Sequence, residues 1–282
     1  MTNDVETRMQ IMGEIEEALG GGPSVVVATV VNGGELGLPA GAKLLVHRDG
    51  STVGGIDPDV DATVAAAGLE AYEAFPRIPA QTLWVHHEGG VVKRRHQSRP
   101  GDAQLMVELF EAPARLLVVG GGHVGLSIAR IGAIVGFSIA VLDDRPEFAN
   151  PERFPMAEEV MCGDIAEELD GTRIDHTTFI VLVSRGHMQD ALALRHTVSR
   201  GPAYLGMIGS RRRTATVLQQ LRDEGYSADD LARVHTPIGL DINAETPEEI
   251  ALAILAEIVL IRKGGTGRML STITSRRAAE AT

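Results

Sequence analysis

The feature that most constrains this fold is a strand–glycine–helix–strand pattern near the middle of the chain. Residues 115–120 form an apolar run that ends in glycine, and Gly120, Gly122 and Gly125 fit the spacing G-x-G-x-x-G. A helix-length stretch follows, and the next apolar run, residues 138–142, ends at Asp143 and Asp144. This order predicts a Rossmann unit, in which glycines let a phosphate approach the N-terminus of a helix.

The remainder of the second half alternates predicted strands and helices. We expect further strands near residues 158–161, 178–184 and 203–207, and helices near 122–135, 164–169, 188–199, 210–225 and 247–262. Alternating apolar strands and helices predict a parallel sheet with helices on both faces. The predicted fold class is therefore α/β, with a Rossmann-like, doubly wound parallel sheet in the C-terminal part.

The first hundred residues follow a different pattern. Predicted helices near residues 4–19 and 59–74 are separated by short β-rich runs and glycine-containing turns, which is typical of a small α+β domain. We expect an N-terminal domain over residues 1–100, a linker at 96–101, a Rossmann-like domain over 101–265 and a flexible tail at 266–282.

Charge and cysteine content exclude several classes of function. The net charge of −12 disfavours nucleic acid and acidic membranes as partners. A single cysteine, Cys162, excludes an intrachain disulfide and a four-cysteine metal site, and we expect a buried, inert thiol. No histidine or acidic cluster has the spacing of a metal site. With neither a secretory signal nor a membrane-length apolar run in the sequence, we expect a cytoplasmic protein.

Polar residues follow several predicted strands, at the carboxyl edge of the sheet where parallel α/β folds bind ligands. The candidate cofactor-binding residues lie in four groups. They are Gly120, Gly121, Gly122, His123, Val124 and Gly125; Asp143, Asp144 and Arg145; Ser184, Arg185, Gly186 and His187; and Gly209, Ser210, Arg211 and Arg212. Their convergence on one edge predicts a binding site more strongly than any one group.

Two of these groups each have two interpretations. Ser210 would cap a helix while Arg211 and Arg212 pair with phosphate, or the arginines would simply be solvated. Asp143 or Asp144 would accept hydrogen bonds from a ribose, which favours NAD over NADP, or the acids would pair with Arg145.

Weaker candidates exist for acid–base catalysis. His187 begins a predicted helix, with Asp190 placed to orient it, and His235 lies in a predicted loop before the last helix. A structural histidine is the alternative for His187, and the loop of His235 would fold over the edge of the sheet as a lid.

Longer stretches carry a family resemblance. GGGHVGLSIARIGAIVGFSIAVLDDRPEFA, VLVSRGHMQD, AYLGMIGSRRR and RVHTPIGLDINAETPEEIALAILAEI resemble the C-terminal Rossmann domain of the XdhC/CoxI/CoxF family, over roughly residues 115–262. ATVVNGGELGLPAGAKLLVHRDGSTVGG is similar to the family's N-terminal domain. Two positions depart from the family pattern. Ala40 stands where members usually have arginine, and residues 54–57 lack the cysteine of the family's Gly-Gly-Gly-Cys-x-Glu run.

The resemblance implies an accessory factor for molybdenum hydroxylases such as xanthine and carbon monoxide dehydrogenases. Such a factor binds molybdenum cofactor, as molybdopterin or its dinucleotide form, assists its sulfuration and delivers it to the apo-enzyme. The implied partners are the hydroxylase apo-enzyme and a cysteine desulfurase, and a homodimer is the default assembly. The residues alone leave two alternatives: an NAD- or NADP-dependent oxidoreductase using His187 or His235, and a partner scaffold with a vestigial nucleotide site.

Overall fold

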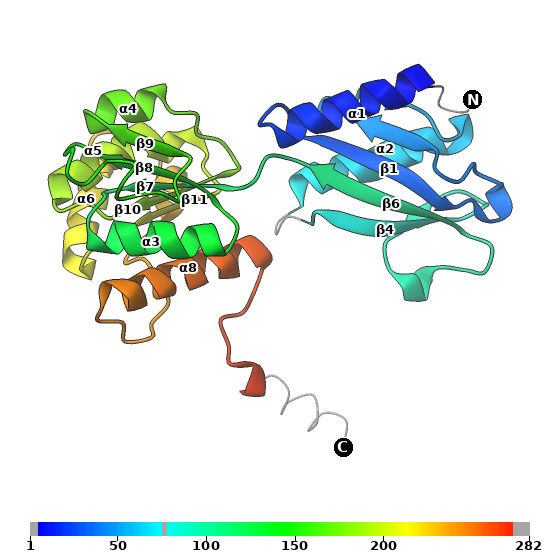
Figure 1. Ribbon diagram of the computed structural model, residues 1–282. Coiled ribbons are helices and arrows are strands. Elements are labelled where there is room, and N and C mark those ends of the chain that lie inside the picture. The colour runs from blue at the N-terminus through cyan, green and yellow to red at the C-terminus, as the bar shows by residue number, and fades with distance from the viewer. Residues whose placement is uncertain (1–4, 75–77, 273–282) are drawn as a thin grey trace. The chain divides into compact units, whose positions relative to one another are not determined.

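The chain forms two compact units, Met1–Ala112 and Pro113–Thr282, each with its own sheet (Figure 1). The computed structural model describes residues 5–74 and 78–272. Of the tail expected at residues 266–282, the part beyond residue 272 lies outside the described residues.

The N-terminal unit is built on an antiparallel sheet with strand order β3-β2-β1-β6-β4-β5. The strands are β1 (Val25–Asn32), β2 (Lys43–Val46), β3 (Thr52–Gly54), β4 (Ala80–Val85), β5 (Val91–Val92) and β6 (Ala103–Phe110), with short 3-10 helices η1 (Gly34–Leu36) and η2 (Arg95–Gln97). Alternate β1 residues point to opposite faces, so Val26 packs in the core with α2 (Pro58–Glu73) and Val25 in the core with α1 (Val5–Leu19). Both helices therefore cover apolar faces of the same sheet, as an α+β domain requires.

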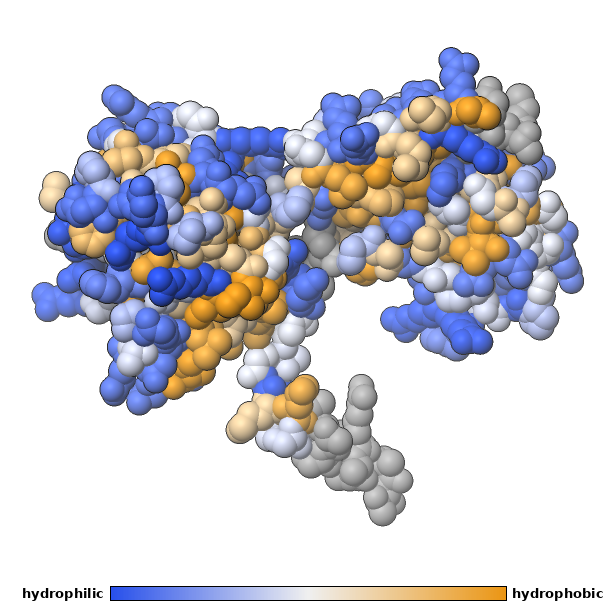
Figure 2. Space-filling model, in the orientation of Figure 1, coloured by the Kyte–Doolittle hydropathy of each residue, from blue (hydrophilic) through white to orange (hydrophobic). Residues whose placement is uncertain are grey.

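The helix α1 buries only part of its apolar surface. Ile11 and Ala18 are fully buried against the sheet. The outward stripe consists of Val5, Met9, Met12 and Leu19, which are 50–79% exposed. Apolar patches of this kind interrupt the polar surface of the N-terminal unit in Figure 2.

The border between the two units lies later than the sequence pattern indicates. Residues 103–110 form β6, which pairs with both β1 and β4 and is central to the N-terminal sheet. The expected linker at residues 96–101 instead contains η2 and the turn into β6. The physical reason is burial. The alternate residues Ala103, Leu105, Val107 and Leu109 complete the core under α2.

The C-terminal unit confirms the predicted α/β class. Its strands are β7 (Arg115–Val119), β8 (Ser138–Asp143), β9 (Glu159–Cys162), β10 (Thr178–Leu182), β11 (Tyr204–Met207) and β12 (Val234–His235). They pair in parallel in the order β12-β11-β10-β7-β8-β9. This is the doubly wound order of dinucleotide-binding folds, with the reversal between β7 and β10.

Two helical layers cover this sheet. The helices α3 (His123–Ile134) and α8 (Pro247–Lys263) share a core with Leu116 and Val118 of β7. The neighbours Leu117 and Val119 face the other layer, made of α4 (Ile165–Gly171), α5 (His187–Thr197), α6 (Arg211–Asp223) and α7 (Ala228–Ala232), with the 3-10 helix η3 (Val198–Arg200) after α5 (Figure 1). Because the strands are parallel, their carboxyl ends lie at one edge of the sheet, and the loops and helix starts gather there.

Among the described residues, no helix has the length and apolar character needed to span a bilayer.

Candidate functional site

Residues 120–125 comprise the connection between β7 and α3 and the first residues of α3. They lie where the strand order reverses, and we call them the glycine turn. The Gly120 N–H donates to the Leu142 carbonyl at the end of β8 (2.7 Å). On the other side, the Val183 N–H after β10 donates to the Val119 carbonyl (2.9 Å). The turn is therefore held between the tips of both neighbouring strands.

Close packing requires glycine at three positions of the turn. A Cβ on Gly121 would lie 2.0 Å from the Phe148 carbonyl oxygen. Gly120 has a φ of +118°, and a Cβ there would lie 2.7 Å from the Val183 carbonyl. A Cβ on Gly125 would lie 1.9 Å from the Gly120 carbonyl oxygen, because α3 packs directly on the turn. Gly120, Gly121 and Gly125 together explain the tight strand-to-helix turn.

Gly122 differs because nothing lies within 4 Å of where its Cβ would be. It is the N-cap of α3, and no side chain caps the helix. The Leu126 N–H closes the first helical turn on the Gly122 carbonyl (2.9 Å), which leaves the preceding N–H groups without an intrahelical acceptor. His123 is exposed and Val124 half-buried. The start of α3 therefore offers open space, free donors and the positive end of the helix dipole.

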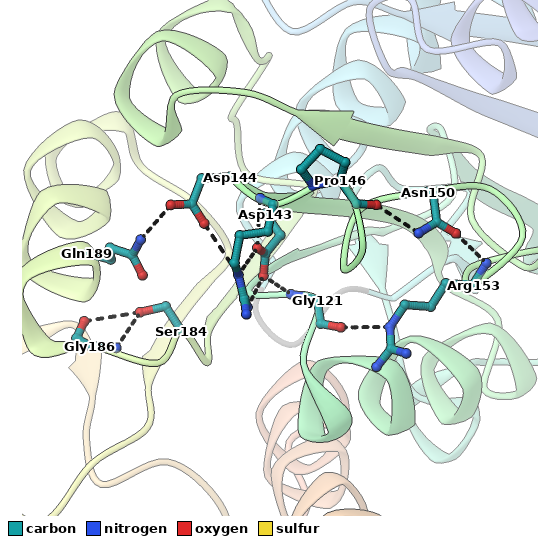
Figure 3. A network of polar contacts seen from close by, with 10 residues as sticks. Gly121, Asp143, Asp144, Pro146, Asn150, Arg153, Ser184, Gly186 and Gln189 are labelled. Atoms are coloured by element: carbon teal, nitrogen blue, oxygen red, sulfur yellow. Dashed lines mark hydrogen bonds and ion pairs between the residues drawn. The ribbon is translucent and has the colours of Figure 1, made fainter.

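Asp143 supports the turn from the tip of β8. Its side chain is 4% exposed, and it accepts from the Gly121 N–H at 2.8 Å (Figure 3). Arg145 donates to the same carboxylate through Nε (2.8 Å), Nη2 (3.0 Å) and the backbone N–H (3.1 Å). Burial acts to raise the pKa of Asp143, but the hydrogen bonds from Arg145 and Gly121 outweigh it and leave the pKa lowered. Asp143 and Arg145 thus pair with each other, as the second interpretation predicts, and only Asp144 of the two acids is exposed.

Sequence reasoning missed two residues beside the turn. Arg153 donates through Nε to the Gly121 carbonyl at 3.0 Å, opposite the Asp143 contact (Figure 3). Phe148 lies under three guanidinium groups, whose carbons are 3.7 Å (Arg145), 5.3 Å (Arg153) and 5.9 Å (Arg185) from its ring centroid. We call these three residues the arginine cluster. An aromatic residue between two arginines after a strand tip was the available signal.

The arginine cluster contains donors that the fold does not use. Arg145 Nη1 and Arg153 Nη2 are buried and have no hydrogen-bond partner in the structure. A buried donor without an acceptor is costly and is uncommon in folded proteins. These two nitrogens are therefore, beside the N–H groups at the start of α3, donors with which an anion at this edge would form hydrogen bonds.

At the tip of β10, Ser184 forms a hydrogen bond with Asp190 of α5. The Ser184 hydroxyl donates to Asp190 at 2.6 Å, and the Asp190 carboxylate is buried. Gly186 is the N-cap of α5, and His187 begins that helix, but the side chain of His187 lies outside the described part of the chain. Gln189 links α5 to the β8 tip through a hydrogen bond to Asp144 (2.9 Å).

The second predicted anion site is a capped helix start. Gly209 precedes Ser210, which caps α6 by accepting from the Arg213 N–H at 3.4 Å. Arg211 and Arg212 are exposed, and no carboxylate among the described residues pairs with them. No hydrogen bond in the described part of the chain joins this group to the glycine turn.

His235 lies in β12 rather than in a loop, because it pairs with Gly206 of β11. Its ring stacks on Tyr204 (centroids 4.7 Å apart), and its Nδ1 is 3.6 Å from Glu257 of α8. Tyr204 donates its hydroxyl to the same carboxylate at 2.6 Å, and burial followed by this contact raises the Tyr204 pKa. The His235 ring is therefore held by Tyr204 and Glu257 in a short strand and not in a loop.

Cys162 contradicts the expectation of a buried thiol. It ends β9, beside Asp143 in the β8–β9 register, and is exposed because β9 is the edge strand. Within residues 5–74 and 78–272, no group of three or more His, Cys, Asp or Glu side chains is arranged to hold a metal ion.

Comparison with known proteins agrees with this fold. The model of the XdhC Rossmann domain family matches residues 116–258, half of the chain. "Uncharacterized protein YqeB" of Escherichia coli (strain K12) is 33% identical over 81% of this chain. The matched region covers only 42% of the length of that protein. The "Molybdenum cofactor insertion chaperone PaoD" of the same organism is 22% identical, with 93% of this chain and 90% of that protein covered.

A solved structure covers both units. The crystal structure titled as a xanthine dehydrogenase from Bacillus halodurans aligns with a TM-score of 0.52 and 18% identity, over 91% of this chain and 96% of that one. At that identity the likeness concerns the fold alone. The matched family model shows that the chain belongs to the XdhC Rossmann domain family, and the glycine turn agrees with this assignment.

Proposed function

We propose that this protein is an accessory factor for a molybdenum hydroxylase and that it binds molybdenum cofactor at the glycine turn. Family membership and the name of the PaoD relative support the general role. The observation that carries the binding site is Gly122, an uncapped helix start in open space at the reversal point of a parallel sheet.

The residues at the turn fit the chemistry of the cofactor. Molybdopterin ends in a phosphate, and its dinucleotide forms contain a pyrophosphate. The N–H groups that follow Gly122 provide neutral donors to an anion, and the helix dipole adds partial positive charge. The unpaired nitrogens of Arg145 and Arg153 add charged donors nearby. No acidic side chain lies in the first turn of α3 to repel the ligand.

Each group at the edge then has a defined part. The backbone of residues 122–125 holds a phosphate, while Asp143 and Arg153 fix Gly121 from both sides and keep the turn in shape. Arg211 and Arg212 at the start of α6 stay solvated and take no part in binding, which is the second of their two interpretations. When bound, the cofactor supplies the redox centre of the client hydroxylase, and this chain holds and orients it for transfer.

The finer steps are also part of the proposal. The partners are a hydroxylase apo-enzyme and a cysteine desulfurase that supplies sulfur, and the protein acts as a homodimer in the cytoplasm. A single cysteine suits a reducing compartment. Light scattering on the purified full chain measures the assembly: a dimer mass is expected, and a monomer mass at micromolar concentration would refute that part.

The decisive experiment identifies the small molecule that the protein carries. The full chain is co-expressed with molybdenum cofactor biosynthesis, purified without oxygen and denatured, and the released compounds are analysed by mass spectrometry. We expect a phosphorylated pterin in wild type and its loss in Gly122→Val. A released nicotinamide nucleotide, or no uptake of excess molybdopterin, would contradict the proposal.

A further inference from the structure

The outward stripe of α1 has the spacing of a seam between two packed helices. Its four apolar members are 50–79% exposed, and the exposed Glu16 stands between the last two. Alternating intervals of four and three positions separate the successive residues Val5, Met9, Met12, Glu16 and Leu19. Side chains at these intervals line one side of a helix that packs along another helix. The helix thus has one apolar side against its own sheet and a second apolar side in solvent.

The sheet face on which α1 lies also has apolar surface left exposed. Met106 of β6 lies between Leu105 and Val107, which pack in the core with α2, so its side chain points to the opposite face, where α1 lies. It is 37% exposed. The helix α1 therefore covers only part of this face, and an apolar surface here marks an interaction site.

Two opposite charges accompany the stripe. Arg8 lies one turn before Met12 and Glu16 one turn after it, and both are exposed. In the described part of the chain, neither of the two forms a hydrogen bond or an ion pair with another side chain. A carboxylate enclosed in an apolar seam is unfavourable unless a cation pairs with it. A partner at this stripe must therefore place a positive charge opposite Glu16.

The remaining acids of α1 do not face the stripe. Glu14 is turned toward the hairpin after β2, where its Oε2 lies 2.6 Å from His47 Nε2. At about 100° per residue, Glu6 and Glu17 lie at least roughly a third of a turn around the helix from Met12. The charges that a partner meets along the seam are thus Arg8 and Glu16.

A second copy of α1 supplies the required cation in one arrangement. Because a helix rises about 1.5 Å per residue, two antiparallel helices related by a two-fold axis beside Met12 put residues equally far before and after Met12 at the same level. Arg8 of one copy is then level with Glu16 of the other, and Val5 is level with Leu19. A parallel pair would instead put Glu16 against Glu16, and like charges repel.

We infer that the outward stripe of α1 binds a second copy of this chain, with the two helices antiparallel about a two-fold axis beside Met12. The inference rests on the homodimer named in the proposed function, and it identifies the surface through which that dimer forms. The same surface is used by both copies, so the two pairs of Arg8 with Glu16 are equivalent. The interface belongs to the N-terminal unit, whereas each glycine turn belongs to a C-terminal unit.

Sedimentation velocity of the full chain tests the surface. Met12→Glu puts two like charges together on the axis, and we expect the dissociation constant of the dimer to rise at least about tenfold, because an enclosed charge without a partner is costly. Met12 is 59% exposed, so the helix content measured by circular dichroism should match wild type. Leu252→Glu on α8 is the matched control, because Leu252 is also apolar and 53% exposed, and it should leave the dimer intact. A dimer that persists in Met12→Glu, or that dissociates only in Leu252→Glu, would overturn the inference.

Charge reversal tests the pairing of Arg8 with Glu16. Arg8→Glu and Glu16→Arg each put like charges at one level, and each is expected to weaken the dimer at least about threefold. Both changes place the charge that the helix dipole favours at that end of α1, so a loss of helix would not explain the weakening. The combined variant reverses both charges and should return to within about twofold of wild type. Additive weakening in the combined variant would refute the antiparallel register.

Disulfide formation distinguishes the antiparallel pair from a parallel one. In a Cys162→Ser background, Met12→Cys should cross-link the dimer on oxidation, because the two copies of residue 12 meet on the axis. Leu19→Cys should not, because the two copies of residue 19 would lie about 20 Å apart along the helices, beyond the reach of a disulfide. Cross-linking of both variants, or of Leu19→Cys alone, would contradict the inferred arrangement.

Failure of this inference is distinguishable from failure of the proposed function. A monomeric wild type would refute the homodimer and this interface together. A dimer that survives Met12→Glu would refute the interface alone. Uptake of molybdopterin per chain is measured on the same samples, and its absence from wild type would refute cofactor binding while the dimer measurements still decide the interface.

Discussion

Two helices, α3 and α6, begin at the same edge of the C-terminal sheet, and their first N–H groups are capped in different ways. The start of α3 follows β7, and its N-cap Gly122 has no side chain to cap the helix. The start of α6 follows β11, and its N-cap Ser210 caps the helix itself through Arg213. A helix end must satisfy its N–H groups with side chains, water or a ligand. The glycine start leaves this task to water or a ligand, whereas the serine start satisfies the Arg213 N–H with its own side chain.

The charges in the sequence, taken alone, would favour the start of α6 as the binding site. Three arginines, residues 211–213, begin α6, while the first turn of α3 contains no charged side chain of either sign except a titratable histidine, His123. The three arginines are exposed, so water and salt screen them and each contributes little. Free N–H groups at a buried turn discriminate more than exposed charge does. The comparison therefore teaches that the weakly charged start of α3 is the better candidate for a binding site.

The largest expected effect on stability comes from disrupting the close packing of the glycine turn. Gly125→Ala places a methyl group 1.9 Å from the Gly120 carbonyl oxygen, so backbone must move. We expect a loss of at least about 3 kcal/mol in the free energy of unfolding, measured with urea. Gly171→Ala is the control, because nothing lies within 4 Å of its Cβ. Wild-type stability of Gly125→Ala would show that the turn is not packed as described.

Neutralising the buried Asp143 carboxylate, which contacts the turn, should have the next largest effect on stability. Asp143→Asn weakens the pairing with Arg145 and is expected to cost about 2 kcal/mol at pH 7. The Asp143 pKa is lowered from 3.8 in the folded protein, so its stabilisation is present above the unfolded pKa and is lost as the pH falls through the lower folded value. Urea unfolding below pH 5 should show this loss in wild type and a shallower one in Asp143→Asn. Parallel pH profiles for the two proteins would refute the role of Asp143.

Gly122→Val separates binding from folding. The Cβ of the new side chain would have no atom within 4 Å, and the φ of −63° suits any residue, so the melting temperature should hardly change. It occupies the space where a phosphate would approach, and we expect at least about a tenfold loss in molybdopterin affinity, about 1.4 kcal/mol. Gly171→Val is the matched control. Undiminished binding would move the ligand away from α3.

The smallest effect should come from the other helix start. Ser210→Ala removes the cap on the Arg213 N–H and is expected to cost about 1 kcal/mol of stability. Ligand affinity should stay within about twofold of wild type, because the serine serves the helix and not the ligand. A large loss of affinity would make the two helix starts equivalent and break the comparison.

The elements with strong local patterns could be predicted from sequence. The strands β7 and β8, the helix α3 between them and the capped helix α8 lie close to their expected ranges, because glycine spacing, apolar runs and the Thr246 cap are local signals. Residues 103–110, which form β6, lie on the wrong side of the predicted domain border. The partner strands β1 and β4 lie far away along the chain, and pairing that completes a sheet has no local signature.

The candidate site was predictable only in part for the same reason. The glycines and Asp143 belong to one motif, but the contact between Arg153 and Gly121 joins residues far apart in sequence. Whether Asp143 is free or paired depends on the conformation of the loop after β8, which the pattern does not specify. The orientation of α1, with Met9 and Met12 outward, likewise depends on the sheet it packs against.

The most direct test of the account follows backbone amides of both helix starts at once. Two-dimensional ¹⁵N–¹H NMR of the full chain is recorded during anaerobic titration with molybdopterin. Saturating shifts of the amides of residues 122–125, with those of residues 211–213 nearly unmoved, are expected. Shifts confined to residues 211–213, or no shift at either helix start, would contradict the assignment of the ligand to the uncapped glycine.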